Sequence, residues 1–241
     1  MEARVSVITK RLDKINRIIS VASSKGGVGK SLVASTLALS LSEKGYKVGL
    51  LDLDLYGPSS HIILGVKKKF PIEEKGLIPP KVNGIKFMSI VYFTEDKPSA
   101  FRGVDITNII IEILAITQWG SLDYLVLDMP PGIGDEILDV IRFIKKSEFL
   151  VITIPSKVAM GAVSKLLKIL KELKIPMIGV LENMKMKNTS MVEELVKNLG
   201  LKYIGSISYD EKLEGAIGNT NLILKTKFIK ELDRNIEKMN F

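Results

Sequence analysis

The sequence has no cysteine at all and only one histidine among its 241 residues. Without cysteine, the chain can form no disulfide bond and no metal site built on its own thiolates. Aromatic residues make up 6% of the chain, and its apolar runs are short or interrupted by charge, so none predicts a membrane span. The first residues, "MEARVSVITKRLDK", show neither the apolar segment nor the cleavage site of an export signal. We therefore expect a cytoplasmic protein.

Acidic residues are also in deficit. The chain has 27 Asp and Glu against 35 Lys and Arg, which gives a net charge of +8. A basic surface suits anionic partners such as nucleotides, nucleic acids or acidic lipids. A solvated surface rich in lysine has the same composition, so the charge alone does not choose among these partners.

Short β-branched runs alternate with helical patterns along the chain. Apolar strands separated by helices predict an α/β fold with a doubly wound, mostly parallel sheet of about seven or eight strands and helices on both faces. The expected strands are 17–23, 46–54, 85–90, 123–129, 148–155, 176–182 and 202–207, and the expected helices are 30–44, 104–118, 135–146, 158–174 and 189–199.

No linker divides this alternation, so residues 1–241 are expected to form a single domain. Within it, 1–16 is an N-terminal extension and 225–241 is a C-terminal helix. Apolar residues recur at helical spacing in 225–241, with Lys and Arg beside the stripe. A terminal helix packed on the domain and a helix lying on a membrane share this pattern. We favour the packed helix, and the sequence leaves both interpretations open.

A glycine-rich loop, "SSKGGVGKS" at 23–31, lies between the first expected strand and the first long helix. It fits the phosphate-binding pattern G-x-x-x-x-G-K-[ST], except that Ser24 replaces the first glycine. Backbone N–H groups of such a loop surround phosphate oxygens, and the positive end of the next helix adds to the attraction. Lys30 is expected to reach the β- and γ-phosphates of ATP. The expected nucleotide-binding residues of this loop are Ser24, Lys25, Gly26, Gly27, Val28, Gly29, Lys30, Ser31 and Leu32.

Acidic residues end two further strands. Asp52 and Asp54 close the strand 46–54, and Asp128 closes 123–129. The carboxyl ends of parallel strands meet at one edge of a sheet, where ligands bind. We expect the Ser31 hydroxyl to ligate Mg²⁺ and Asp128 to hold it through water. One of Asp52 and Asp54 would orient the water that attacks the γ-phosphate, and the other would lie in the outer shell of Mg²⁺.

These motifs make the chain resemble the MinD/ParA ATPases, whose phosphate-binding loop carries an additional early lysine. Within that group it resembles the Mrp/ApbC-like P-loop ATPases, whose family role is to carry iron–sulfur clusters. The resemblance extends from about residue 17 to residue 220. The shared stretches include "SSKGGVGKS" (23–31), "DLDLYGPS" (52–59), "FRG" (101–103), "WGSLDYLVLDMPPGIGDE" (119–136) and "IPMIGVLENM" (175–184).

The resemblance implies a slow ATPase that forms a homodimer with ATP at the interface. It assigns the early lysine, Lys25, to the phosphates of the partner subunit, where it would act like an arginine finger. It assigns Asp54 to the attacking water and Asn183 to a hydrogen bond with adenine. Lys25, Lys30 and Asp54 are then the expected catalytic residues. The magnesium residues are Ser31, Asp52 and Asp128, the aspartates acting through water.

The chain departs from the Mrp/ApbC-like pattern after "ENM" (182–184). The family usually presents two cysteines there, spaced C-x-x-C, which bridge a cluster across the dimer. This chain continues "KMKNTS" instead, so no iron–sulfur cluster is expected on it alone. A cluster-related role would need a cysteine-bearing iron–sulfur protein as partner. Leu32 also replaces a usual threonine, which removes one hydroxyl near the α-phosphate.

Two functions follow from these observations. The first is an Mg²⁺- and ATP-dependent dimeric ATPase of the Mrp type without cluster ligands of its own. The alternative is a MinD/ParA-like positioning or partitioning ATPase that acts on membrane or DNA, which the basic charge and the C-terminal helix allow. The stretches "GPS", "PPGIGD" and "ENM" favour the first function.

Overall fold

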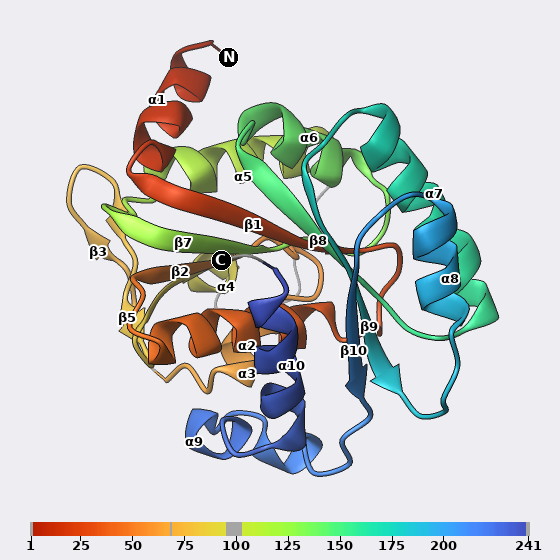
Figure 1. Ribbon diagram of the computed structural model, residues 1–241. Helices are drawn as coiled ribbons and strands as arrows, with labels where there is room; N and C mark the ends of the chain where they lie inside the picture. Colours follow the sequence, from red (N-terminus) through yellow and green to blue (C-terminus); the bar gives the residue numbers. More distant parts are fainter. Residues whose placement is uncertain (1, 68, 95–102, 240–241) are drawn as a thin grey trace.

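A computed structural model describes residues 2–67, 69–94 and 103–239 (Figure 1). Phe101 and Arg102 of the "FRG" stretch lie outside these residues. Eight strands form the central sheet in the order β10-β9-β8-β1-β7-β2-β6-β5, and every neighbouring pair is parallel except β5 with β6. The strands are β1 (Ile15–Ser23), β2 (Val48–Asp52), β5 (Lys81–Val82), β6 (Ile85–Ser89), β7 (Leu122–Asp128), β8 (Ser147–Thr153), β9 (Met177–Lys185) and β10 (Tyr203–Ser208).

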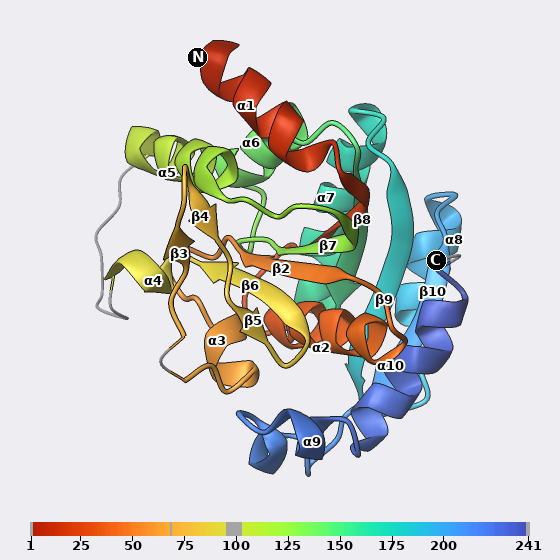
Figure 2. The same cartoon turned by 90° about the vertical axis from the view of Figure 1, so that its left-hand side faces the viewer.

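Helices cover both faces of this sheet, as Figures 1 and 2 show. One face packs against α2 (Lys30–Glu43) and α10 (Lys227–Glu237), and their apolar residues form one buried cluster with it. The opposite face forms a second cluster with α1 (Glu2–Leu12), α5 (Gly103–Ile116), α6 (Asp135–Phe143), α7 (Lys157–Glu172) and α8 (Met191–Asn198). The prediction of a doubly wound, mostly parallel sheet is therefore confirmed.

Short elements complete the described chain. The irregular segment between β2 and β6 contains α3 (Ser60–Ile63) and a two-stranded antiparallel ribbon of β3 (Ile72–Glu73) and β4 (Leu77–Ile78). Helix α4 (Val91–Thr94), a 3₁₀ turn (Glu214–Ala216) and α9 (Thr220–Ile223) are equally brief. No helix in the described ranges is both long and apolar enough to span a membrane.

Of the strand ends that differ from the prediction, two move site residues. Strand β2 ends at Asp52, because the Asp52 carboxylate accepts the Asp54 N–H at 3.1 Å and turns the chain. Asp54 therefore lies in the following loop. Strand β9 continues to Lys185, because the next strand pairs along it and the Tyr209 N–H reaches the Lys185 carbonyl. Asn183 consequently lies within a strand and not after it.

The C-terminal helix α10 packs on the domain. Its apolar residues Phe228, Ile229, Leu232 and Ile236 are buried against the α2 face of the sheet. The side chain of Thr226 accepts the Ile229 N–H and caps the start of the helix. The packed helix that we favoured is thus confirmed, and its apolar stripe faces the sheet.

Helix α10 also supplies side chains to the edge of the sheet. Strand β10 ends the strand order, so within the described residues one side of it has no neighbouring strand. On α10, the Asn235 amide donates to the Ser206 carbonyl at 3.0 Å, and the Glu231 carboxylate accepts the Ser208 N–H at 2.6 Å. Side chains thus satisfy two backbone groups of β10.

Candidate active site

The glycine loop bridges β1 and α2 in a conformation that requires glycine. Gly27 and Gly29 have φ angles of 77° and 81°, in the left-handed region. A Cβ on Gly29 would also lie 2.3 Å from the Asn183 amide nitrogen. A Cβ on Gly26 or Gly27 would meet no atom within 4 Å. The loop therefore packs tightly against β9 at Gly29 and is open at Gly26 and Gly27.

A cavity of about 330 Å³ lies over this loop. The predicted residues Ser24 and Val28 do not line it; Val28 is buried, and its carbonyl accepts the Asn183 amide at 2.9 Å. Asp54 does line the cavity, as expected for a residue that orients water. The lining residues are Ser23, Lys25, Gly26, Gly27, Gly29, Lys30, Ser31, Leu32, Asp54, Gly57, Ser59, Ile63 and Pro131.

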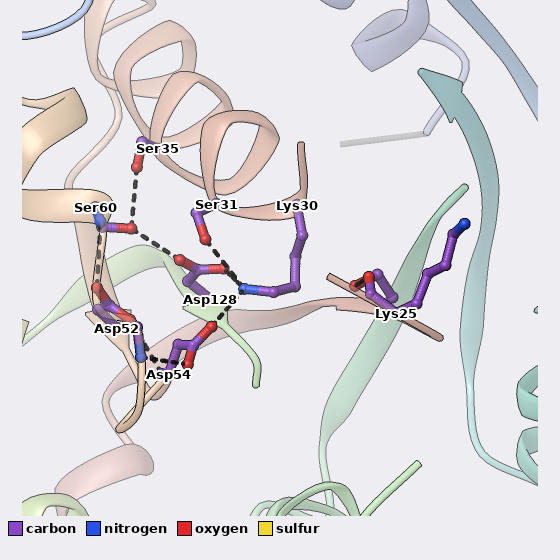
Figure 3. Close-up of polar contacts among 10 residues, drawn as sticks. Lys25, Lys30, Ser31, Ser35, Asp52, Asp54, Ser60 and Asp128 are labelled. Atoms are coloured by element: carbon purple, nitrogen blue, oxygen red, sulfur yellow. Dashed lines mark hydrogen bonds and ion pairs between the residues drawn. The ribbon is translucent and has the colours of Figure 1, made fainter. Parts of the chain in front are cut away.

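The ammonium group of Lys30 is at the centre of the polar contacts (Figure 3). It donates to Asp128 Oδ1 in a short, buried ion pair and lies 3.1 Å from Ser31 Oγ. Asp54 Oδ2 is 4.0 Å away. The structure thus brings together the predicted lysine, the aspartate predicted to orient water and two of the predicted magnesium residues.

Asp52 is buried and does not line the cavity. It is paired in register with Asp128 on the neighbouring strand, and both side chains are buried. Burial, and then the charge of Asp128, raise the pKa of Asp52 well above its ordinary value, against the effect of the Asp54 N–H. Both oxygens of Asp52 accept backbone N–H groups, from Asp54 and from Ser60. These contacts give Asp52 a direct role in shaping the loop that carries Asp54.

Ser60 joins the two buried carboxylates and was not identified from the sequence. Its backbone N–H donates to Asp52 Oδ2 at 3.2 Å, and its hydroxyl donates to Asp128 Oδ2 at 2.9 Å. The Ser35 hydroxyl of α2 donates in turn to the Ser60 hydroxyl at 3.1 Å. The only signal in the sequence was a second serine directly after "DLDLYGPS". Ser60 thereby fixes the start of α3 relative to both strands.

Ser60→Ala is expected to lower the free energy of unfolding by about 1–3 kcal/mol, because a buried carboxylate and a buried serine each lose a hydrogen-bond partner. Ser59→Ala is the matched control, since the Ser59 side chain makes no capping hydrogen bond and should change stability by less than about 0.5 kcal/mol. Urea denaturation of both variants measures the difference. Equal stability of the two variants would show that the Ser60 hydroxyl does not stabilise the fold.

A second cavity, of about 130 Å³, adjoins the first. Leu32 lines both cavities, and the predicted adenine residue Asn183 lines the second. We refer to it as the base cavity, after the adenine base that Asn183 is predicted to bind. Its other walls come largely from the segment after β10, for which the sequence predicts no role. These residues are Met184, Ser208, Tyr209, Asp210, Glu211, Leu213, Glu214, Ile217 and Phe228.

Lys25 lies apart from the Lys30 cluster. Lys25 is half-buried, and its side chain is directed away from Lys30 and the aspartates (Figure 3). Among the residues that the structure describes, no carboxylate forms an ion pair with its ammonium group. The structure therefore separates the two loop lysines.

The residues present fit a magnesium nucleotide. The Ser31 hydroxyl and the Asp128 carboxylate are oxygen ligands of the kind that Mg²⁺ prefers, and both contact the same cation, the Lys30 ammonium. Within the described ranges, no group of three or more His, Asp or Glu side chains is arranged to hold a metal ion. A metal at this site would thus need further oxygen ligands from phosphate.

A family model and individual known proteins that match this chain point to the same family. The family model of NUBPL iron-transfer P-loop NTPases, of the ParA type, matches residues 14–239. A protein of Aquifex aeolicus named iron–sulfur cluster carrier protein is 39% identical over 220 residues, which cover 85% of this chain and 60% of that protein. A protein of the same name from Methanocaldococcus jannaschii is 35% identical over 96% of this chain and 87% of its own. The match thus spans 60% of the Aquifex relative, which is less than two thirds of its length.

Solved structures of nucleotide-binding proteins have the same fold. A nucleotide-binding protein from Archaeoglobus fulgidus in complex with ADP has a TM-score of 0.77 at 30% identity, over 92% of this chain and 93% of its own. The septum site-determining protein MinD from Pyrococcus horikoshii, complexed with Mg-ADP, has a TM-score of 0.68 at 19% identity, over 93% and 96% of the two chains. At that identity, the second match supports the fold alone.

Proposed function

The chain belongs to the family of NUBPL iron-transfer P-loop NTPases, and we propose that it is an Mg²⁺-dependent ATPase acting as a homodimer in iron–sulfur cluster transfer. The observation that carries this proposal is the contact of Lys30 with Ser31, Asp128 and Asp54 over an open glycine loop. The names of the relatives support the link to cluster transfer. A cytoplasmic location is part of the proposal.

The chemistry needed at this site is positioning and neutralisation of charge. Lys30 would exchange its ion pair with Asp128 for the β- and γ-phosphates, which frees that carboxylate for a water ligand of Mg²⁺. Bound Mg²⁺ would neutralise charge on the phosphate oxygens. Asp54 is held by the Gly57 N–H at 3.1 Å and lines the cavity, so its other oxygen can orient the attacking water. Asn183 would hold adenine in the base cavity through its amide oxygen and the one amide proton that it does not donate to Val28.

Asp54→Ala tests the proposal. Hydrolysis of ATP should fall by about 10²-fold or more, because the attacking water loses its partner, while ATP affinity stays within a few-fold. Phosphate release measures the first quantity and calorimetry the second. Asp13→Ala, an exposed aspartate at the end of α1, is the control and should retain full turnover. Full turnover in Asp54→Ala would assign the water to another residue, with Asp52 the next candidate.

The cluster itself would be cargo held by a partner. Cluster iron requires thiolate or imidazole ligands, and this chain offers no cysteine and one histidine. The segment that follows "ENM" in the sequence offers thioethers and amines instead. We therefore propose that a cysteine-bearing iron–sulfur protein supplies the ligands, and that this chain contributes the nucleotide-dependent step.

Anaerobic reconstitution with ferrous iron and sulfide should leave the protein colourless and free of bound iron after desalting. Visible charge-transfer absorption and iron analysis measure the outcome. The Aquifex relative, treated in parallel, is the positive control. One cluster or more per dimer on this chain would contradict the expectation.

The positioning or partitioning function loses its main structural support. The apolar stripe of α10 is buried against the sheet, so a membrane-binding helix would first have to leave the domain. Stimulation of the ATPase by DNA or by anionic liposomes would nevertheless favour that function over cluster transfer.

A further inference from the structure

Helix α3 and the segment after β10 meet between the two cavities of the candidate site. Ile63 on α3 lines the cavity over the glycine loop, which we refer to as the phosphate cavity. Three residues of the segment after β10 line the base cavity, and we refer to them as the base wall: Leu213, Glu214 and Ile217. Helix α9 follows the base wall and lies close to α3 in Figures 1 and 2. A nucleotide that fills both cavities would pass this junction.

A small apolar cluster fills the junction, and we refer to it as the isoleucine cluster. Ile63, Ala216 and Ile223 are its buried members, and Leu32 and Ile217 pack against them. Leu32 lines both cavities, Ile63 lines the phosphate cavity, and Ile217 belongs to the base wall. The isoleucine cluster therefore joins a wall of one cavity to a wall of the other.

The backbones of the two segments also touch. The Gly218 N–H donates to the Ile63 carbonyl at 3.2 Å. Gly65, just after α3, has a φ of 61°, and a Cβ there would lie 2.1 Å from the Gly218 carbonyl oxygen and 2.9 Å from its carbon. Backbone atoms cannot approach a Cβ so closely, so this contact requires glycine at position 65. Any side chain there would push the two segments apart.

Helix α3 is fixed relative to the acidic residues of the phosphate site. At its start, Ser60 donates its N–H to Asp52 and its hydroxyl to Asp128. At its end, the Asn83 amide donates to the Leu64 carbonyl at 2.9 Å. Both ends of α3 are thus bound to other parts of the chain.

The base wall depends more on its neighbour. Within 213–219, the N–H groups of Ala216, Ile217 and Asn219 donate to carbonyls of the same segment. The Gly218 N–H crosses to α3 instead, and most of the segment is exposed or half-buried. A Cβ at position 65 would therefore displace the base wall more than it displaces α3.

We propose that Gly65 and Gly218 are positioning residues, which hold the base wall on α3 and thereby set the affinity of the site for the base of the nucleotide. The phosphates would be held by the glycine loop and Lys30, so a shift of the base wall acts on the nucleoside alone. The inference rests on the proposed function, because it concerns how the ATP site holds its base.

Gly65→Ala tests this role with two ligands, Mg-ADP and Mg-pyrophosphate, each titrated by calorimetry. Pyrophosphate has no base and reports on the phosphate cavity alone. The variant should bind ADP about tenfold or more weakly than the parent, because the base wall is displaced, and should bind pyrophosphate within about twofold. A general loss of structure would weaken both ligands together.

Gly200→Ala is the matched control. Gly200 follows α8 and has a φ of 66°, so alanine introduces the same backbone strain there. Its Cβ would lie 3.8 Å from the Lys171 ammonium, which is an ordinary contact. This variant should bind both ligands within about twofold of the parent.

A second variant decides the matter if Gly65→Ala does not fold. Ile223→Ala truncates a buried member of the isoleucine cluster that is not among the lining residues of either cavity. It should weaken ADP about fivefold or more and leave pyrophosphate within about twofold. Ile8→Ala shortens an equally buried isoleucine in α1 and should leave both affinities as in the parent.

Two results would overturn the inference. The first is equal weakening of ADP and pyrophosphate in Gly65→Ala or in Ile223→Ala, because the contact would then serve the phosphate site. The second is an ADP affinity in these variants no lower than in their controls. A parent protein that binds no ADP would instead refute the proposed ATPase, so the two failures are distinguishable.

Discussion

Lys25→Ala is expected to lower ATP hydrolysis about 10³-fold or more, the factor that an arginine finger supplies. ATP affinity of the monomer should change little, because Lys30 and the loop amides still bind the phosphates. Lys25 points away from Lys30 and is not paired with any carboxylate of the described chain, so we expect it to act on the partner's nucleotide and not on its own. ATP-dependent dimerisation, followed by sedimentation, should fail in the same variant.

Mixing variants tests whether Lys25 acts across the dimer. Lys25→Ala subunits and Asp54→Ala subunits are each expected to be inactive alone. In a mixed dimer, the site on the Lys25→Ala subunit keeps its own Asp54 and receives Lys25 from the partner, so activity should return. The control replaces the second component by the double variant Lys25→Ala/Asp54→Ala, which supplies no lysine. If mixed dimers form but stay inactive, Lys25 does not act in trans.

Lys30→Ala should abolish detectable ATP binding and should also destabilise the protein. The lysine is buried in an ion pair with Asp128, which is itself fully buried. Its removal leaves that carboxylate uncompensated, which costs about 3–5 kcal/mol of the free energy of unfolding. Calorimetry of ATP binding and urea denaturation measure the two effects.

The double variant Lys30→Ala/Asp128→Asn separates binding from stability. Without the carboxylate there is no buried charge to compensate, so most of the lost stability should return, while ATP binding should not. Recovery of ATP binding in the double variant would mean that Lys30 serves the fold and not the nucleotide. A single variant as stable as the parent would contradict the importance of the buried pair.

The order of strands and helices could be predicted because its signals are local. Strand β7 is a nearly continuous apolar run that ends in Asp128, and the glycine loop stands between a strand and a helix. Each pattern is contained in a few residues. Because ligands bind at the carboxyl ends of parallel strands, these patterns also predict that the aspartates lie near the loop. The cavity and the Lys30 contacts agree with that rule.

The residues missed from the sequence depend on contacts between distant segments. Ser60 matters because Asp52 and Asp128 are paired in register on neighbouring strands, which no local pattern reveals. The walls of the base cavity come from the segment after β10, where the sequence shows only mixed polar and apolar residues.

The contacts of α10 with the outer strand β10 also hinder pairing of this strand with a strand of another copy of the chain. An open strand edge is a template on which another chain can polymerise. Asn235 and Glu231 occupy two such backbone positions of β10, and helix α10 brings both side chains there together. Helix α10 therefore hinders strand addition at this edge and also forms part of the core. A chain truncated before this helix would expose the outer strand and part of the core at once, and its characteristic failure in the cell would be aggregation.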